Sequence, residues 1–349
     1  MPVSKPSAIE LKVDSSKLSS LAHKDLLSVT VDLDVDAPSM FTLELLSPGE
    51  EMNKTSWSDA DLFAPGSTVE IKLGQVGSLT TVMKGEVTGM ELEASGESGQ
   101  RLTVRGYDIG HRQMRSTKIR SFAAMSAGDI AKQVASENSL TPSVTDTKVK
   151  LDYVLQDSES DFDFLKRLAR IYGYIVYIDD ATLYFGPRKF SESAAVTLSR
   201  GVEISEFHLN LSTHGLPGKV VVRAWDITKK EAITATATAS DVPKMGTTLG
   251  LSAAESAFGS ADITLVNAPV TTADAASALA LAKLSEASLE YIQGDVVCAG
   301  SAALKPGVVV ALSGLGTSFS GNYYVTAAKH TFYGTEGYKT TLSVRRNAT

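Results

Sequence analysis

Four carboxylates cluster near the middle of the chain with a spacing that could serve acid–base chemistry. Asp157, Glu159, Asp161 and Asp163 alternate along the sequence, and paired carboxylates are the catalytic groups of most glycoside hydrolases. The same residues lie where an amphipathic segment begins, and negative charge at a helix N-terminus is stabilised by capping and by the helix dipole. We therefore predict that this cluster caps a helix and is not catalytic.

Three aspartates earlier in the chain have the spacing of a calcium-binding loop. Asp32, Asp34 and Asp36 match the start of an EF-hand, but Ala37 stands where that loop needs glycine and Leu43 where it needs glutamate. Apolar residues alternate with the aspartates, which is the pattern of a half-buried strand. The sequence therefore predicts a strand whose solvated face carries the three carboxylates.

Residues that could bind a metal or act as a nucleophile are few. The histidines are His23, His111, His208, His214 and His330, and Cys298 is the single cysteine. One cysteine excludes an intrachain disulfide and a cysteine-based zinc site. The even spacing of His208 and His214 would place them on one face of an extended strand, but no Cys or Asp partner accompanies them. Cys298 has apolar neighbours, so we predict a buried structural thiol.

A glycine-rich stretch from Gly314 to Gly321 resembles a phosphate-binding loop only loosely. It matches neither nucleotide-binding pattern, and no helix is expected after it, so we predict a hairpin loop. A G-x-S-x-G nucleophile motif is also absent from the sequence. We therefore assign no catalytic, cofactor-binding or metal-binding residue, and we expect no cofactor and no enzymatic activity.

Charge is distributed unevenly along the chain. The formal net charge is −7, while residues 1–100 carry 7 Lys, no Arg and 16 acidic residues. A basic patch follows, made of Arg101, Arg105, Arg112, Arg115, Lys118 and Arg120. An acidic chain with little aromatic interleaving is a poor candidate for nucleic-acid binding. We predict that the patch contacts an acidic partner surface, for which residues 1–100 of another copy are one candidate.

The length of 349 residues fits two or three domains at roughly 150 residues each. We expect no secretory signal in the first residues, and no apolar run approaches the roughly 20 residues of a membrane helix. Strands are expected over the first hundred residues, including 27–35 and 41–46, the latter ended by Ser47-Pro48-Gly49. Helices are expected only after residue 120.

Each expected helix carries a start signal. Ser126 opens a helix that ends near Asn138, and Ser160 opens a helix over 162–172 that Gly173 terminates. A hairpin follows, with strands 174–178 and 183–185. A further helix is expected from Thr271 to about Tyr291, closed by Gly294. The remaining expected elements are strands over 204–225, a weak strand or a spacer over 234–239, an exposed loop 240–262, and strands and turns after 294.

Residues 62–106 and 304–346 follow the same order of turns and strands, which predicts an internal duplication. The shared landmarks are Pro65-Gly66 and Pro306-Gly307, strands 69–73 and 308–312, Gly85 and Gly321 opening the next strand, the G-x-x-G turns 96–99 and 334–337, and the closing strands Leu102–Arg105 and Leu342–Arg345. We predict two β-barrel or sandwich units of one fold, separated by a mixed α/β block.

Residues 159–173 resemble the pattern E-S-D-x-x-F-L-x-R-L-A-x-x-x-G of baseplate hub proteins, the late-control D type of contractile-tailed phages. The hub part of the valine–glycine-repeat spike proteins of type VI secretion is similar. The resemblance covers roughly residues 60–346. Further matching stretches are Gly106-Tyr107-Asp108 with His111-Arg112, residues 218–226 against V-x-V-R-G-W-D with Ala224 in place of the usual Gly, Leu304–Gly307, Ser313–Gly316, Phe319–Val325 and His330-Thr331.

The resemblance implies a mixed, β-dominated α+β fold with two similar tube-type β-barrel domains and an interleaved α/β domain. The implied domains are 1–107 for the first barrel, 108–203 plus 234–289 for the α/β domain, and 204–233 plus 290–349 for the second barrel. Three chains would then form a ring with pseudo-sixfold symmetry.

The implied function is that of a structural baseplate hub in a contractile tail or injection machine, located in the tail baseplate or particle and assembled in the bacterial cytoplasm. Its implied partners are two further copies, the tail tube protein, the central spike protein and other baseplate proteins, without stable nucleic-acid binding or membrane insertion. Since the sequence ends soon after the second barrel, we expect the spike tip on a separate chain.

Two other functions stay open on sequence alone. One is a peptidoglycan-degrading hydrolase component of the tail, because some related machines carry a lysozyme-like domain. The other is a receptor- or glycan-binding β module.

Overall fold

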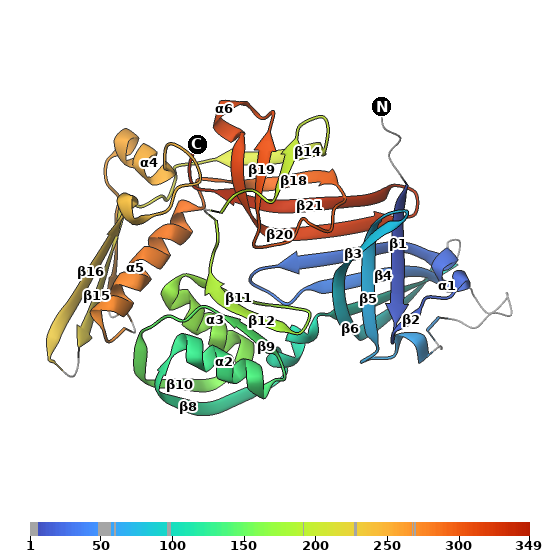
Figure 1. Ribbon diagram of the computed structural model, residues 1–349, viewed down its shortest axis with the longest axis horizontal. Coiled ribbons are helices and arrows are strands. Elements are labelled where there is room, and N and C mark those ends of the chain that lie inside the picture. Colours follow the sequence, from blue (N-terminus) through green and yellow to red (C-terminus); the bar gives the residue numbers. More distant parts are fainter. Residues whose placement is uncertain are drawn as a thin grey trace.

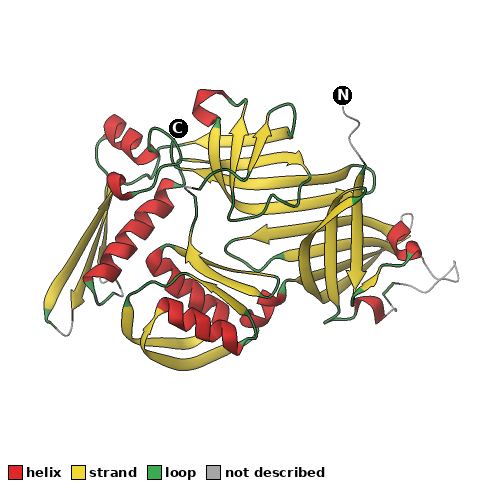
Figure 2. Cartoon of the chain, in the orientation of Figure 1, coloured by secondary structure: helices red, strands yellow, loops and turns green. Residues whose placement is uncertain are grey.

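The computed structural model describes residues 6–47, 57–58, 61–95, 99–190, 192–226, 229–266, 268 and 270–349. Strands dominate the chain, and most helical residues lie in its middle third and in one later insertion (Figure 2). Figure 1 shows two groups of strands along the top and right of the view, a compact α/β block below them and a small sheet with a long helix at the left.

A 13-stranded sheet runs through the molecule in the order β14-β18-β21-β20-β3-β4-β7-β6-β5-β1-β2, and β19 and β13 branch from β20. We call its first set of strands the N half: β1 (Ser7–Val13), β2 (Ser16–Lys17), β3 (Leu26–Asp34), β4 (Met40–Ser47), β5 (Thr68–Gln75), β6 (Ser78–Ser95) and β7 (Gly99–Tyr107). The second set is the C half: β13 (Val196–Ser199), β14 (Ile204–Leu211), β18 (Ile292–Ala299), β19 (Val309–Ser313), β20 (Gly321–Tyr333) and β21 (Gly337–Arg346).

The two halves repeat the same ladder. In the N half the order β5-β6-β7-β4-β3 is antiparallel throughout, and in the C half β19-β20-β21-β18-β14 is built in the same way. The Pro-Gly turns dock identically: Gly66 N–H donates to the Val87 carbonyl at 2.8 Å, and Gly307 N–H donates to the Val325 carbonyl at 2.8 Å. Both glycines have positive φ, which favours glycine at this turn.

Even the irregularities of the two ladders coincide. A β-bulge interrupts β6–β7 and β20–β21 directly after the valine that receives the turn, and a second bulge interrupts β3–β4 and β14–β18 near the start of β3 and β14. The four register shifts lie between Val87 and Gly89, Val325 and Ala327, Leu26 and Ser28, and Ile204 and Glu206. Because bulges fix register, the predicted duplication is a property of the strand ladders and not of shared turn residues alone.

Two details of the predicted duplication are wrong. Gly85 lies inside β6 instead of opening a strand, whereas Gly321 does open β20. The sequence aligned Leu102 with Leu342, but counting from the bulges, Met90 pairs with Val104 where Ala328 pairs with Leu342. The equivalent of Leu342 is therefore Val104, two residues further along. A slip of two residues keeps the same face of a strand, so alternation alone cannot detect it. The strand order of each half is open, and closure of either half into a barrel remains a prediction.

The halves join within the chain through β3 and β20. The first residues of β20 pair with β19, and its later residues pair antiparallel with β3, from Ala327 opposite Asp34 to Tyr333 opposite Ser28. Two hydrophobic cores lie on either side of this join, one built almost entirely from the N half and one from the C half with the later insertion.

The α/β block connects β7 to β13. Its elements are η3 (Ile109–Met114), β8 (Thr117–Ser126), α2 (Ala127–Glu137), β9 (Thr141–Val144), β10 (Lys150–Ser160), α3 (Asp161–Tyr172), β11 (Tyr174–Asp179) and β12 (Thr182–Pro187). Ser126 and Ser160 cap the two helices by accepting from Asp129 N and Asp163 N, and Gly173 ends α3 at φ +66°. Both helices and the β11–β12 hairpin therefore form where the sequence predicted them.

An insertion between β14 and β18 occupies the position of the short β3–β4 connection in the N half. It contains β15 (Lys219–Asp226), β16 (Glu231–Thr238), η4 (Ala239–Asp241), α4 (Gly250–Phe258), β17 (Asp262–Val266) and α5 (Ala273–Ser288). The strands form a sheet of their own in the order β16-β15-β17, and α5 packs against it (Figure 1).

This insertion corrects several sequence-based expectations. The predicted second barrel included residues 204–233, but β15 pairs with β16 and β17 instead of joining the C half. The expected loop 240–262 contains α4 and buries Leu249 and Leu251. The helix expected from Thr271 is α5, which begins after Thr272 and stops at Ser288, while Gly294 lies inside β18. Of the two alternatives for 234–239, the strand is confirmed over 234–238 within β16, while Ala239 begins η4.

Smaller differences concern the first hundred residues. A short helix, α1 (Ser20–Asp25), precedes residue 120, as does the 3-10 turn η2 (Asp61–Phe63). The bulge in β3 turns Leu27 to the solvent, although the alternation placed it in the core. The predicted turns at Pro48-Gly49 and at residues 96–98, and the first five residues, lie outside the described part of the chain.

Candidate functional site

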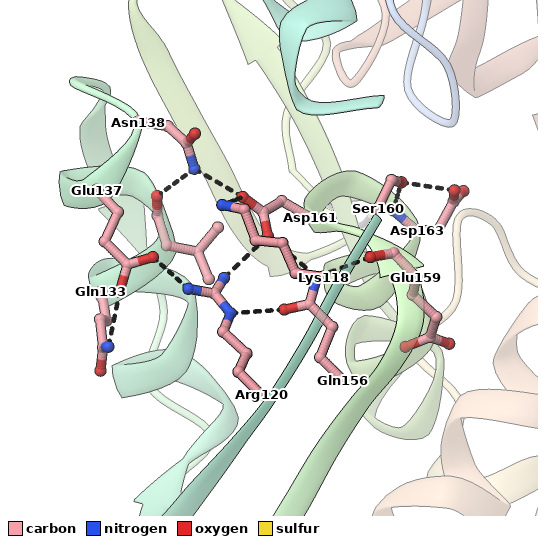
Figure 3. A network of polar contacts seen from close by, with 11 residues as sticks. Lys118, Arg120, Gln133, Glu137, Asn138, Gln156, Glu159, Ser160, Asp161 and Asp163 are labelled. Carbon is pink, nitrogen blue, oxygen red and sulfur yellow. Dashed lines mark hydrogen bonds and ion pairs between the residues drawn. The ribbon is translucent and has the colours of Figure 1, made fainter. Parts of the chain in front are cut away.

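One member of the acidic cluster, Asp161, lies in a buried polar network at the start of α3 (Figure 3). Asp161 is almost fully buried and accepts four hydrogen bonds from three different elements. The donors are Lys118 Nζ at 2.6 Å, Arg120 Nη2 at 2.9 Å, Asn138 Nδ2 at 3.0 Å and Gln156 Nε2 at 3.1 Å. The network therefore fastens the β8–β10 ribbon to the C-terminal end of α2 and the N-terminal end of α3.

These contacts determine the protonation state of Asp161. Burial alone would raise the pKa of this carboxyl, but hydrogen bonds from Lys118, Gln156 and Asn138 and the charge of Arg120 outweigh it and hold the pKa below its usual range. A carboxylate that stays ionised, with its acceptors engaged by the chain itself, is poorly suited to donate a proton to a glycosidic oxygen.

The other three carboxylates of the cluster have separate contacts. Ser160 Oγ accepts from Asp163 N at 3.1 Å and donates to the Asp163 carboxylate at 2.6 Å, which confirms the predicted cap. Glu159 binds Arg167 on the next turn of α3, with Nε 2.8 Å from Oε1. Asp157 is exposed on β10. The sequence therefore predicted the capping but missed the inward-facing role of Asp161, whose partner Lys118 lies far away along the chain.

The basic patch is largely neutralised by the same chain. Arg112 donates two hydrogen bonds to Glu86, from Nε at 2.9 Å and from Nη2 at 2.6 Å, and Arg105 lies 2.7 Å from Glu91. Lys118 and Arg120 pair with Asp161, as described above. Glu86 and Glu91 of the acidic first hundred residues therefore supply partners for this patch within one chain, and its contact with another copy stays a prediction.

The remaining candidate residues do not come together as a site. His208 lies on β14 opposite Asp295, whereas His214 follows in a loop, so they do not share a strand face. Among the residues that the structure describes, no group of His, Cys, Asp or Glu could hold a metal ion. Cys298 is buried, and burial raises the pKa of its thiol to about 12, which confirms the predicted structural thiol.

Two further expectations concern loops and strands. The glycine-rich stretch contains a one-turn helix, α6 (Gly316–Phe319), where a plain hairpin loop was predicted. The three aspartates do lie along and just after β3, as predicted, with Asp36 N–H donating to Asp34 at 2.6 Å. No helix among the described residues is long and apolar enough to cross a membrane.

Asp108 is a buried carboxyl that the sequence analysis did not single out as a site. Its two oxygens accept from Ser39 N at 2.6 Å and from Gly110 N at 2.8 Å, so it links the N half to η3. Burial raises its pKa to about 6, although both backbone hydrogen bonds act in the opposite direction. The sequence did contain a signal that could have identified Asp108, because this residue belongs to the Gly106-Tyr107-Asp108 stretch that carried the family resemblance.

Two strand edges of the large sheet have no partner among the described strands. In the N half, β5 pairs with β6 only as far as Glu86, and the edge of β6 beyond the bulge is unpaired among the described strands. In the C half, β14 ends the strand order, so its outer edge is also open. Met90 and Leu92 on β6 and Phe207 on β14 are exposed large apolar side chains at these edges. Such edges are ready to pair with another chain.

A search of solved structures places this fold among tail proteins. The 43 kDa tail protein of prophage MuSo2 from Shewanella oneidensis matches with a TM-score of 0.72 and 16% identity, covering 97% of this chain and 98% of that one. A tail protein from Neisseria meningitidis MC58 matches with a TM-score of 0.69 and 15% identity, covering 98% and 97%.

An Escherichia coli component of the type VI secretion system, structurally similar to T4 bacteriophage tail proteins gp27 and gp5, matches with a TM-score of 0.62 and 13% identity, covering 97% of this chain and 77% of that one. The chain therefore has the fold of phage tail and type VI secretion proteins, and the resemblance to baseplate hub and spike-like proteins is confirmed.

A comparison with protein-family models gives the family of the chain. The sequence model of the Alg8 N-terminal domain matches residues 4–333, and the chain belongs to that family. No curated protein sequence matches the chain.

Proposed function

We propose that this chain is the structural baseplate hub of a contractile tail or injection machine. In this proposal three copies form a ring with pseudo-sixfold symmetry, which joins the tail tube to the central spike and lines the channel. The chain works as a scaffold and not as an enzyme, in the tail baseplate or injection particle, after assembly in the bacterial cytoplasm. Other baseplate proteins bind around it.

The internal duplication carries the proposal. One chain holds two copies of the same ladder, matched in strand order, Pro-Gly docking and bulge positions. Three such chains would present six similar units to a sixfold tube, while keeping threefold symmetry for a spike. The shared fold with tail proteins over nearly the whole chain supports the same conclusion.

The three-domain division belongs to this proposal. The N half and C half would be the two tube-type units, closed into barrels by loops and neighbouring copies, with the α/β block and the 212–291 insertion outside the ring. The separate hydrophobic core of the block, which is built from α2, α3 and the strands around them, supports treating it as a unit.

Measurement of particle mass tests the function. The chain is purified alone and also co-expressed with a candidate tail tube protein and a candidate spike protein from the same genome, and each sample is measured by mass photometry and imaged by electron microscopy. We expect threefold rings, alone or with a partner. Monomers under every condition would contradict the hub. Peptidoglycan turnover that is lost on Glu159→Gln would instead favour the hydrolase alternative.

A further inference from the structure

We propose that the far end of β6 in one copy pairs antiparallel with β14 of the next copy, in the register that the chain already uses where β20 pairs with β3. This inference rests on the proposed function, because it names the surfaces through which hub copies meet. The occupant of each open edge is therefore a second copy of this chain.

The join between β3 and β20 is the template. On its apolar face Ala328 lies opposite Leu33, and His330 opposite Val31. On its polar face Lys329 lies opposite Asp32, with Nζ 3.7 Å from the carboxylate. The apolar face is sealed, since Val31 and His330 are both 0% exposed.

The duplicated bulges place the open edges in the same frame. The bulge after Val87 in β6 matches the bulge after Val325 in β20, so Met90, Leu92 and Ala94 occupy the positions of Ala328, His330 and Phe332. The bulge near the start of β14 matches that of β3, so Phe207, Leu209 and Leu211 occupy the positions of Val29, Val31 and Leu33. On the edge that faces away from β21, β20 pairs with β19 before its bulge and with β3 after it. On the equivalent edge, which faces away from β7, β6 pairs with β5 before its bulge and with no described strand after it.

The derived register pairs Met90 with Leu211, Leu92 with Leu209, and Ala94 with Phe207. Each pair places apolar against apolar on the face that continues the hydrophobic cores. The same side chains are exposed in one copy, with Met90 at 39%, Leu92 at 48% and Phe207 at 40%. Their equivalents within the chain are buried, so the missing neighbour explains the exposure.

The polar face of the derived register is also compatible. It sets Glu93 opposite His208 and Glu91 opposite Asn210, an acceptor opposite a side chain that can donate in each case. Any register displaced by one residue would bring Glu91 and Glu93 onto the apolar face, because the side-chain period of a strand is two. The alternation therefore excludes registers displaced by an odd number of residues, and the matched bulges select this register among the remaining ones.

The geometry of this contact leads to closed rings. Each copy offers one β6 edge and one β14 edge on different halves, so the contact is head-to-tail and repeats around an axis until it closes. In a trimer, three joins between copies would alternate with three β3–β20 joins within copies. All six units of the ring would then be linked by like joins.

Paired cysteines test the register. Glu93→Cys with His208→Cys places two thiols directly opposite each other in adjacent copies, within the reach of a disulfide. The matched control is Thr331→Cys with Thr30→Cys, the equivalent pair of the join within the chain. The displaced control is Glu93→Cys with Asn210→Cys. After oxidation we expect a crosslinked ladder of chains for the first pair, a crosslinked monomer for the second and little product for the third.

A charge placed on the apolar edge tests the contact independently. Leu92→Lys should abolish ring formation at concentrations where the wild type assembles, while the melting temperature of the monomer changes little because Leu92 is exposed there. Ile119→Lys, at a side chain that is 75% exposed on β8, should leave rings intact. Crosslinked copies and loss of rings support the join. Rings that survive Leu92→Lys and give no crosslink between copies overturn the join and leave the hub. Wild-type monomers with both partners present overturn the hub and the join together.

Discussion

His330 lies directly opposite Val31 where β20 pairs with β3, at the centre of the join between the two halves. Both side chains are fully buried. The Nδ1 atom of His330 is 2.8 Å from the Tyr338 hydroxyl and 3.1 Å from the Thr340 hydroxyl, while Nε2 has no partner within the described residues. The position therefore holds a neutral imidazole, and its protonation would bury an unpaired charge in the join.

We predict that acidification weakens the folded chain through His330. Burial lowers its pKa from 6.5 to about 4; a backbone hydrogen bond with Leu304 opposes this shift, and the charge of Lys305 acts in the same direction as burial. Between these two pH values the unfolded state binds more protons, so stability is fully present above pH 6.5 and is lost as the pH falls to 4. The loss should be on the order of 3 kcal/mol, measured by urea unfolding at a series of pH values.

His330→Gln is the control, since its amide does not titrate. The difference in unfolding free energy between wild type and variant should shrink as the pH falls through this window. The comparison is made at each pH because Asp108 acts in the opposite direction: with its pKa raised to about 6, it makes the folded state bind more protons between pH 3.8 and 6. A constant difference would show that His330 has the same pKa in the folded and unfolded states, so that burial does not lower it.

Asp161→Asn should destabilise the chain by about 3 kcal/mol, because removing one partner of a buried pair leaves Lys118 and Arg120 without their shared anion. Glu159→Gln removes only a partly exposed pair with Arg167 and should cost less than about 1 kcal/mol. Chemical denaturation of both variants measures the contrast. Equal costs would mean that Asp161 does not anchor the α/β block.

Much of this fold follows from local sequence signals. Ser160 and Gly173 mark the two ends of α3, because a cap and a left-handed stop act over a few residues. The Pro-Gly turns revealed the duplication for the same reason. The bulges that set its register leave no such mark, so the closing strand was aligned two residues away from its true position.

The candidate site depended more on distant partners. Alternation identifies β15 as a strand but does not tell which strand will pair with it, and the residues that cover Val220 and Val222 lie in α5 and its surroundings. Likewise, no local pattern around Lys118 indicates that it binds Asp161 rather than a second copy. The open edges of β6 and β14 became visible only once the paired edges were known, because exposure of Leu92 is a property of the assembled ladder.

Gly173→Ala should destabilise the chain by more than the strain of one left-handed residue. A Cβ at this position would lie 2.9 Å from the Cβ of Ala282 on α5, in addition to the cost of φ +66°. Gly215→Ala isolates the strain, because Gly215 has φ +79° and nothing within 4 Å of an added Cβ. We expect about 1 kcal/mol for Gly215→Ala and at least twice that for Gly173→Ala in thermal unfolding. Equal effects would show that α3 and α5 do not pack closely.

Asn347→Ala should weaken the attachment of the last residues of the sequence to the insertion. Asn347 is buried, its amide donates to the Pro243 carbonyl at 2.8 Å, and its oxygen accepts from Met245 N at 3.0 Å. Truncation would leave the N–H of the buried Met245 without a partner, at a cost of about 1–3 kcal/mol. The amide hydrogens of Thr247 and Gly250, which donate to carbonyls of the same final residues, should then exchange with solvent faster.

Asn322→Ala is the control, since the Asn322 side chain makes no hydrogen bond within the described residues, and it should change stability by less than about 0.5 kcal/mol. Unchanged exchange at Thr247 and Gly250 in Asn347→Ala would mean that the side chain does not hold this contact, and that the backbone bonds alone are sufficient.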